Sequence, residues 1–319
     1  PMVIPEPSYF TQIDVLMQKY DGSGITIGIV DTGVDASHPA LSGISIIAWH
    51  DYVNGKDKPY DDDKPYDDNG HGTHIAGILV AHSSWYDPLF GRPMLKGIAP
   101  SASYIIVKAI DKNGTGSDQN VASAINFCAS NGADVICLSL GGKNILILGT
   151  NTENAAASAA SKGIFVIAAA GNDPQASDVA APANQQNVIA VGAVDSYNKI
   201  ADFSQKGNNA GIIPGLGGRS DPNKKPEVVA PGVGIVSCWK NGEYRYAYGT
   251  SQAVPYVGGE LALVLQARGG SPHSASFVST VKTAIMNTAK KCPGQAAAAH
   301  DDRYGYGLIQ AADLLAALQ

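Results

Sequence analysis

Three polar residues stand in sequence contexts that suit acid–base and nucleophilic chemistry. Asp31 directly follows an apolar run, in Asp31-Thr32-Gly33, whereas His71 and Ser251 each stand at the start of a helical pattern. A serine hydroxyl is a weak nucleophile unless a neighbouring imidazole accepts its proton. The imidazole in turn needs a carboxylate that holds its tautomer and stabilises the imidazolium. Together, these residue types indicate nucleophilic catalysis by a serine.

The elements that carry these residues predict that they meet. Short apolar runs alternate with helical patterns along the chain, which predicts an α/β fold: three layers, with a mainly parallel sheet and helices on both faces. We expect strands over 25–30, 44–49, 104–109, 135–140, 164–169 and 188–194, and helices over 73–82, 121–130, 155–161, 251–268, 274–289 and 313–318. In such sheets ligands bind at the carboxyl ends of the strands, where helices begin.

Each candidate residue has an ordinary structural alternative when it is taken alone. An Asp at a strand end and a Ser at a helix N-cap are common features of folded proteins. His71 and His74 are also three residues apart on one predicted helix, a spacing that metal ligands use. A metal site is not favoured, because no third ligand stands at a recognisable spacing.

Seven motifs in one order along the chain favour the catalytic interpretation. They are IVDTGVDASHP at 29–39, DDNGHGTHIAG at 67–77, GIAP at 97–100, LSLGG at 138–142, IAAAGN at 167–172, KPEVVAPG at 225–232 and GTSQAVPYVGG at 249–259. With these residues the chain resembles the subtilisin-like serine proteases, the subtilases, from about Ile25 to Leu308. The resemblance implies that residues 1–319 form a single catalytic domain, with residues 1–20 as an N-terminal extension packed on it.

The resemblance implies a role for each residue of the site. The chain is expected to be a serine endopeptidase that hydrolyses extended polypeptides through an acyl-enzyme at Ser251. His71 would act as general base and then general acid, with Asp31 orienting it. Asn172 falls at the position of the oxyanion-hole asparagine, and it would donate together with the backbone N–H of Ser251. This chemistry requires no cofactor.

Substrate binding is expected at two glycine-containing edges, to which an extended peptide can add as a strand. The resemblance assigns one edge to Gly114, Thr115 and Gly116, and the other to Leu140, Gly141 and Gly142. It also implies that two segments wall the first specificity pocket, namely Ser139 to Gly142 and the three residues Ala169, Ala170 and Gly171. Asp173 would lie at its rim, where we predict that it favours Lys or Arg beside the scissile bond.

Two other functions remain open at this stage. One is a subtilase-like transpeptidase or macrocyclase, in which an amine displaces the acyl-enzyme. Such an enzyme needs a lid that shields the ester from water, and neither the acidic loop at 51–68 nor the segment 83–96 has a helical pattern of that kind. The other is an inactive peptide-binding domain, which the complete set Asp31, His71, Ser251 and Asn172 disfavours.

The sequence departs from the family pattern at four positions. Gln252 follows the nucleophile, where the family usually has Met. Tyr256 and Gly258 stand where His and Ala are common. None of these changes removes a catalytic group. Ala40 occupies the place of an Asp that serves many family members as a calcium ligand, and this puts that particular calcium site in question.

An acidic segment before His71 carries most of the net charge of −6. Residues 51–68 hold seven Asp and three Lys and contain the hexapeptide Asp-Lys-Pro-Tyr-Asp-Asp twice, at 57–62 and 63–68. The segment is either a solvated loop or a structural calcium site, since calcium prefers carboxylate and carbonyl oxygens. The candidate ligands are Asp57, Asp61, Asp62, Asp63, Asp67 and Asp68.

Composition limits the remaining functions and partners. With 22 Lys+Arg against 28 Asp+Glu, the chain has no basic excess for a nucleic-acid partner. The longest smooth apolar run, 163–171, is far shorter than the roughly 20 residues of a membrane span. The family resemblance implies polypeptide substrates as partners and a removed pro-segment as a candidate inhibitor, and we expect a monomer.

Compartment and processing are less constrained. The N-terminus lacks the pattern of a signal peptide, and a start at Pro1 suggests a processed form. The family resemblance favours a secreted protein. Four cysteines, Cys128, Cys137, Cys238 and Cys292, match no metal-binding spacing and are equally compatible with buried thiols and with disulfides.

Overall fold

A seven-stranded parallel sheet forms the centre of the structure, a computed structural model that describes residues 11–54, 64–82, 95–140, 150–211 and 218–319. The strand order is β2-β3-β1-β4-β5-β6-β7. The strands are β1 (Thr26–Asp31), β2 (Ser45–Asp51), β3 (Ser103–Lys108), β4 (Val135–Leu138), β5 (Phe165–Ala169), β6 (Ile189–Val194) and β7 (Val228–Pro231). The predicted α/β class with a mainly parallel sheet is confirmed.

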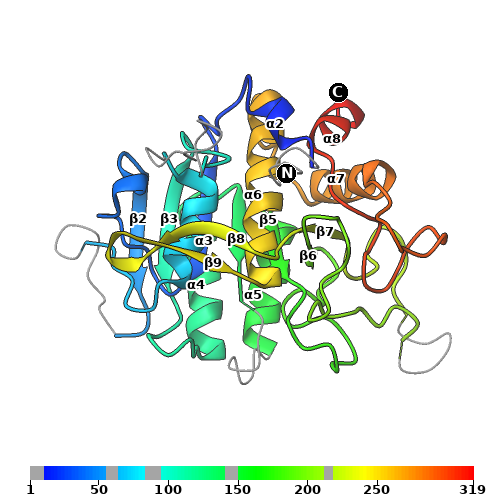
Figure 1. The fold of residues 1–319 in the computed structure, drawn as a ribbon, viewed down its shortest axis with the longest axis horizontal. Helices are drawn as coiled ribbons and strands as arrows, with labels where there is room; N and C mark the ends of the chain where they lie inside the picture. Colours follow the sequence, from blue (N-terminus) through cyan, green and yellow to red (C-terminus); the bar gives the residue numbers. More distant parts are fainter. Residues whose placement is uncertain (1–10, 55–63, 83–94, 141–149, 212–217) are drawn as a thin grey trace, which may run out of the picture.

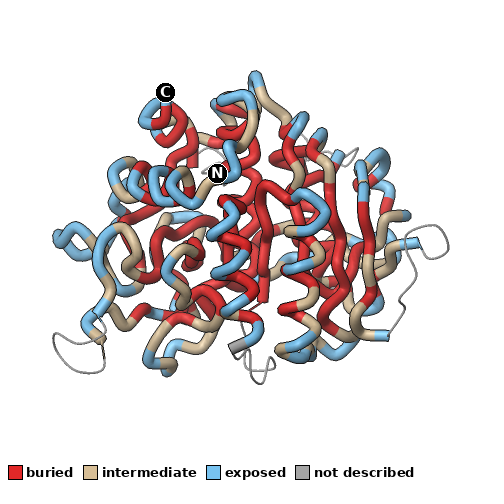
Figure 2. Tube along the Cα trace, turned by 180° about the vertical axis from the view of Figure 1, so that it is seen from behind, coloured by how far each residue is buried: buried red, intermediate tan, exposed pale blue. Residues whose placement is uncertain are grey.

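Helices cover both faces of the sheet (Figure 1). One face packs against α3 (His71–Val80), α6 (Thr250–Ala267), α7 (Ala275–Thr288) and α8 (Ala311–Ala317), and the other packs against α4 (Asp118–Ser130) and α5 (Thr150–Ser161). Strand residues alternate between the two cores: Ile27 and Ile29 of β1 join the first, and Val30 joins the second. Except for the edge strand β2, the strands are buried almost throughout (Figure 2), which explains why most of them read as continuous apolar runs.

The sequence-based boundaries agree with the observed ones to within about five residues, but the short helix α2 (Ile13–Leu16), strand β7 and a second, two-stranded sheet were not predicted. Strand β7 is short and ends in Pro231, so it lacks a long apolar run. A two-stranded antiparallel sheet, β8 (Ile235–Trp239) and β9 (Glu243–Ala247), was also missed. Residues of β9 alternate only weakly in burial, because most of this strand lies at the surface.

The N-terminal and C-terminal segments pack together. The short helix α2 (Ile13–Leu16) buries Ile13 and Leu16 in the first core, beside α8. The backbone N–H of Ala311 donates to the carbonyl oxygen of Thr11, and Gln12 donates to Asp313. None of the described helices is long and apolar enough to cross a membrane.

All four cysteines are free and buried. The sequence left thiols and disulfides equally open, and the structure gives thiols. Cys128 and Cys137 lie in the two cores on opposite faces of the sheet. Burial raises the pKa of the Cys137 thiol to about 12, which keeps it protonated and unreactive near neutral pH.

Candidate active site

Asp31 and His71 come together at the carboxyl end of β1. The Nδ1 atom of His71 lies 2.8 Å from Oδ1 of Asp31, whose side chain is 1% exposed while that of His71 is 30% exposed. Burial alone would lower the pKa of His71, but the charge and hydrogen bond of Asp31, with the charge of Asp67, raise it. The contact assigns a proton to Nδ1 and leaves Nε2 as the basic nitrogen.

Asp67 organises the loop that leads into α3. Its Oδ1 accepts hydrogen bonds from the Thr32 hydroxyl and from the backbone N–H groups of Asn69 and Gly70. Its Oδ2 accepts from both the N–H and the hydroxyl of Thr73. A carboxylate at a helix N-terminus satisfies N–H groups that have no intrahelical partner. Asp67 thereby fixes the start of the helix that carries His71.

The β8–β9 hairpin packs against the same end of α3. Gly70 has a φ of 114°, and a Cβ at this position would lie 2.3 Å from the Trp239 ring, so only glycine permits this contact. His74 reaches the hairpin through Nε2, which lies 3.1 Å from the carbonyl oxygen of Ile235. The Ser237 hydroxyl donates to the carbonyl oxygen of His74 at 2.7 Å. His74 is therefore a structural residue rather than a metal ligand.

Ser251 lies in the first turn of α6, next to the end of β4. Its hydroxyl donates to the carbonyl oxygen of Ser139 at 2.9 Å, and the Ser139 hydroxyl donates to the carbonyl oxygen of Ser251 at the same distance. Among the described residues, the hydroxyl forms no hydrogen bond with His71. Rotation about χ1 of Ser251 would release the hydroxyl from Ser139, and apo sites commonly have such loose geometry.

Asn172 is oriented by Thr250, the residue that precedes Ser251. Its Oδ1 accepts hydrogen bonds from the backbone N–H and the hydroxyl of Thr250, both at 2.9 Å. The amide nitrogen is therefore directed toward the Gly249–Ser251 segment, where a Cβ on Gly249 would lie 3.4 Å from it. The Thr250 hydroxyl also accepts from the backbone N–H of Gly171 at 3.1 Å. This places an amide donor beside the N-terminus of α6.

Comparison with known proteins now decides the family. The sequence profile described as "Subtilase family" matches residues 22–307. The chain belongs to the subtilase family. This subtilase is 40% identical over 272 residues to the thermophilic serine proteinase of Bacillus sp. (strain AK1), an alignment that covers 85% of this chain and 58% of that protein. It is 34% identical to subtilisin DY of Bacillus licheniformis, an alignment that covers 86% of this chain and 87% of that protein.

The chain thus spans less than two thirds of the first relative and most of the second. Thermitase of Thermoactinomyces vulgaris is 36% identical over 276 residues, 86% of this chain and 84% of the relative. Among solved structures, the prenylagaramide maturation protease PagA superposes with a TM-score of 0.74 at 26% identity, covering 96% of this chain and 98% of that chain. The fold of this subtilase is therefore shared along nearly all of its length.

The residues expected at the substrate edges follow strand ends in this subtilase. At the first edge, the carboxylate of Asp111 accepts hydrogen bonds from the backbone N–H groups of Asn113 and Thr115 and so stabilises a turn. Thr115 is exposed in this turn, between Gly114 and Gly116. On the other side, Ser139 and Leu140 follow β4 and are buried. Gly141 and Gly142 lie outside the described residues.

The walls expected for the first pocket come from β5 and the turn after it. Ala169 ends β5, and Ala169, Ala170 and Gly171 are all buried. Asp173 lies next to Asn172 and is half-buried, with its backbone N–H donating to Oε1 of Gln205 at 3.2 Å. Its carboxylate accepts from the N–H of Gln175 at 3.1 Å.

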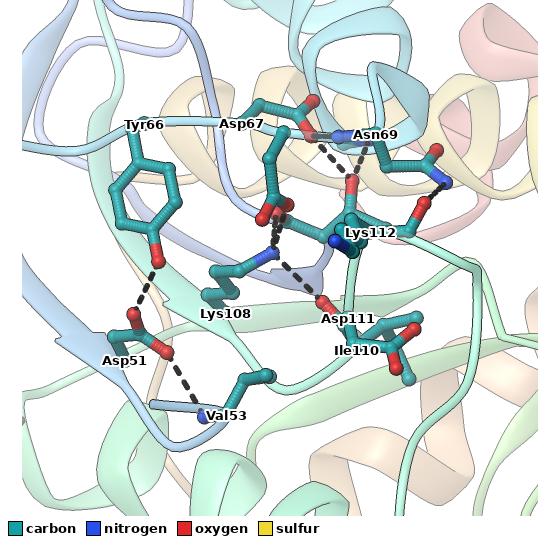
Figure 3. Close-up of polar contacts among 12 residues, drawn as sticks. Asp51, Val53, Tyr66, Asp67, Asn69, Lys108, Ile110, Asp111 and Lys112 are labelled. Atoms are coloured by element: carbon teal, nitrogen blue, oxygen red, sulfur yellow. Dashed lines mark hydrogen bonds and ion pairs between the residues drawn. The ribbon is translucent and has the colours of Figure 1, made fainter. Parts of the chain in front are cut away.

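The acidic segment has a structural role in its described part. Tyr66 donates to Asp51 at 2.6 Å, and Lys108 donates to Asp68 at 2.7 Å and to the carbonyl oxygen of Ile110 (Figure 3). Asp67 is buried and accepts five protein hydrogen bonds. Because both oxygens of Asp67 already accept protein hydrogen bonds, Asp67 does not suit a calcium ion. One oxygen of Asp68 is paired with Lys108. Asp57, Asp61, Asp62 and Asp63 lie outside the described residues.

The sequence did not single out several residues that support this site. Thr32 bonds Asp31, Thr250 bonds Asn172, and Lys108 joins three segments of the chain. The signal for Lys108 was present: a lysine inside the otherwise apolar run 104–109 must find partners for its charge. The threonines gave no such signal, because their partners are set by tertiary contacts.

Proposed function

We propose that this chain is a serine endopeptidase that hydrolyses peptide bonds of extended polypeptides through an acyl-enzyme at Ser251. The observation that carries the proposal is the 2.8 Å contact of His71 with the buried carboxylate of Asp31, in a chain of the subtilase family. A buried carboxylate at Nδ1 makes Nε2 the base and stabilises the imidazolium that forms when the serine is deprotonated.

In the proposed reaction the Ser251 oxygen attacks the carbonyl carbon of the scissile bond while its proton passes to Nε2 of His71. The tetrahedral oxyanion accepts from the Asn172 amide and from the backbone N–H of Ser251. Collapse breaks the C–N bond, and His71 gives the proton to the leaving amine. Water then repeats the sequence and releases the acid from Ser251. The Ser251 hydroxyl first has to leave the carbonyl oxygen of Ser139.

Labelling with a fluorophosphonate probe tests this proposal. We expect covalent labelling of the wild type and none of Ser251→Ala, because the probe phosphonylates an activated serine. Ser279→Ala is the matched control, since Ser279 is an exposed serine of α7 and is not part of the candidate site. Equal labelling of wild type and Ser251→Ala would contradict the proposal, as would the absence of labelling in the wild type.

We also propose that Asp173 favours a basic residue beside the scissile bond. Its half-buried carboxylate next to Asn172 supports this specificity. In the variant Asp173→Asn, the ratio of cleavage after Lys or Arg to cleavage after Leu is expected to fall about tenfold, on the scale of one removed charge pair. An unchanged ratio would exclude the assignment.

A transpeptidase or macrocyclase uses the same acyl-enzyme and differs only in the acceptor. The likeness to the PagA maturation protease supports testing it. Mass spectrometry of a peptide substrate incubated with an added amine nucleophile separates the two reactions: hydrolysis predicts the free acid as the main product. Two segments were considered as a lid, and both lie largely or partly outside the described residues: 83–94 of the segment 83–96, and 55–63 of the acidic loop.

Several finer features of the proposal follow family membership. We propose a single catalytic domain over residues 1–319 that acts as a secreted monomer, with a removed pro-segment as its inhibitor. Structural calcium remains a prediction that concerns Asp57, Asp61, Asp62 and Asp63, because Asp67 and Asp68 already have protein partners. Thermal unfolding with and without a chelator tests it, and an unchanged midpoint would argue against a structural ion.

A further inference from the structure

Lys108 is a buried lysine that has no part in the acyl transfer itself. Its side chain is 0% exposed, and its Nζ donates to the carbonyl oxygen of Thr32 at 2.7 Å, to Asp68 at 2.7 Å and to the carbonyl oxygen of Ile110 at 3.0 Å. An ammonium has three protons, so each one has an acceptor. Because an unpaired buried ammonium is costly, these acceptors must stay together.

Each acceptor belongs to a segment that carries part of the site. Thr32 follows Asp31 at the end of β1, Asp68 lies in the loop that ends at His71, and Ile110 pairs with Gly116 at the first substrate edge. Lys108 itself ends β3, where it lies beside Asp31 in the register of the sheet. One ammonium group therefore joins three segments from separate parts of the chain.

The connection from Lys108 to Asp31 and His71 runs through Thr32. The backbone N–H of Thr32 donates at 2.7 Å to Oδ1 of Asp31, the same oxygen that contacts His71. The Thr32 hydroxyl accepts from the backbone N–H of Gly72 at 2.9 Å, in the first turn of α3. A residue held at its carbonyl by Lys108 thus bonds both the carboxylate and the helix of the base.

We propose that Lys108 is a positioning residue for the reaction at Ser251, an inference that rests on the proposed endopeptidase function. Its ammonium keeps the Asp31 strand end, the loop before His71 and the first substrate edge in the arrangement that proton transfer requires. Misplacement of a catalytic group by about 1 Å can cost about a hundredfold in rate. The role therefore concerns kcat more than substrate affinity.

The test compares Lys108→Met with the matched control Lys225→Met. Lys225 is also 0% exposed and paired with a carboxylate, but it bonds Glu227 and the carbonyl oxygen of Val188 at the other end of the sheet. Competent sites are first counted by titration with a fluorophosphonate. We expect kcat per titrated site to fall about ten- to a hundredfold in Lys108→Met, with KM changed less than threefold. Lys225→Met should keep the wild-type kcat per site.

A spectroscopic signature separates positioning from a loss of folded protein. In the Ser251→Ala background, with ¹⁵N-labelled histidine, the downfield Nδ1–H proton of His71 reports the contact with Asp31. This resonance should shift or broaden in Lys108→Met and stay in place in Lys225→Met. If Lys108→Met does not fold, Asp68→Asn serves instead. It breaks the ion pair by removing the charge of Asp68, whose side chain is 39% exposed, and it leaves the buried lysine in place. A fall in kcat of several-fold is expected there.

The outcomes are distinct. A folded Lys108→Met with a kcat within twofold of wild type and an unmoved His71 resonance overturns the inference while leaving the endopeptidase function intact. An unchanged kcat in Asp68→Asn, where Lys108→Met is unfolded, does the same. A wild type that neither labels nor turns over substrate contradicts the proposed function and this inference together.

Discussion

At the scale of single residues, the candidate site depends on neighbours that fix the direction of each polar group. Thr32 bonds the oxygen of Asp31 that faces His71, and Thr250 occupies Oδ1 of Asn172 with two hydrogen bonds. An amide whose oxygen is already bonded can present only its nitrogen to an oxyanion. Preorganised donors of this kind cost no reorganisation at the moment of reaction.

Replacing Asn172 tests this preorganisation. We expect Asn172→Leu to lower kcat about 10²–10³-fold with little change in KM, the magnitude that removal of the corresponding donor has in a subtilisin. The physical reason is that the donor acts on the oxyanion and barely on the ground-state carbonyl. Steady-state kinetics with a peptide substrate measures it. A raised KM with an unchanged kcat would instead assign Asn172 to substrate binding.

The contact between Asp31 and His71 predicts how activity depends on pH. Only neutral His71 can accept the serine proton, and Asp31 stabilises the protonated form, so the pKa of His71 is raised above its ordinary value near 6.5. The value of kcat/KM should therefore rise with pH, with an apparent pKa above 6.5.

The variant Asp31→Asn is the control for this profile. It should lower kcat/KM about 10⁴-fold through loss of the tautomer and of the imidazolium-stabilising charge, and it should move the apparent pKa downward. A wild-type profile with a midpoint well below 6.5 would contradict the assignment of His71 as the base.

At the scale of elements, the β8–β9 hairpin and α3 form one unit around His74. The imidazole of His74 is fully buried, and its Nε2 approaches the carbonyl oxygens of Ile235 and Arg245 from the two strands. Burial, together with the charge of His71, lowers the pKa of His74 to about 4. The hairpin thus holds a neutral histidine against the helix that begins with the candidate base.

This buried histidine predicts a loss of stability in mild acid. Below pH 6.5 the unfolded chain takes up a proton on His74, whereas the folded protein does so only near pH 4. The free energy of unfolding should therefore fall as the pH drops from about 6.5 to 4, by about 3 kcal/mol from this residue. Urea unfolding of the Ser251→Ala protein, which cannot digest itself, measures the change at both ends.

His74→Gln separates this contribution from other acid effects. Its side-chain amide can still donate to the hairpin carbonyls but does not titrate in this range. The variant should lose distinctly less stability between the two pH values than the protein with His74. An identical loss would show that other groups, not His74, are responsible.

At the scale of the whole molecule, a second buried charge cluster joins α7 to the far edge of the sheet. Glu227 pairs with Lys225 and Lys282, both at 2.8 Å, and all three side chains are at most 1% exposed. Burial, with the neighbouring charge of Lys282, lowers the pKa of Lys225 to about 7, although Glu227 opposes this. One carboxylate therefore compensates two ammonium groups.

Removing this carboxylate should destabilise the fold without touching the chemistry. Glu227→Gln leaves two buried ammonium groups without a counter-charge, and we expect a loss of about 3–5 kcal/mol in the free energy of unfolding. Lys225→Met keeps the Glu227–Lys282 pair and should lose less. Activity per titrated site should stay at the wild-type level in both, because the cluster and the site lie at different strands. Equal stability of Glu227→Gln and wild type would refute the role of the cluster.

The sequence by itself determined the fold class and the candidate chemistry. Strands buried on both faces have to be continuous apolar runs, and helix starts carry Ser, Asp or glycine, so both kinds of element could be read from local patterns. The order of Asp31, His71 and Ser251 within seven motifs then assigned the family. The short strand β7 and the β8–β9 hairpin could not be predicted from the sequence, because neither has a long apolar run of its own.

Tertiary structure alone decided which groups hold the site in place. The Asp31–His71 contact spans 40 residues, the Ser139–Ser251 pair spans 112, and Lys108 reaches Thr32 across 76. No local pattern encodes which distant oxygen completes a buried donor; packing fixes that choice. Asp67 illustrates the difference: its sequence context suggested a calcium ligand, and the fold makes it the carboxylate that caps the helix of His71. Residue type determines which chemistry is available, and long-range packing determines how the polar groups that perform it are oriented.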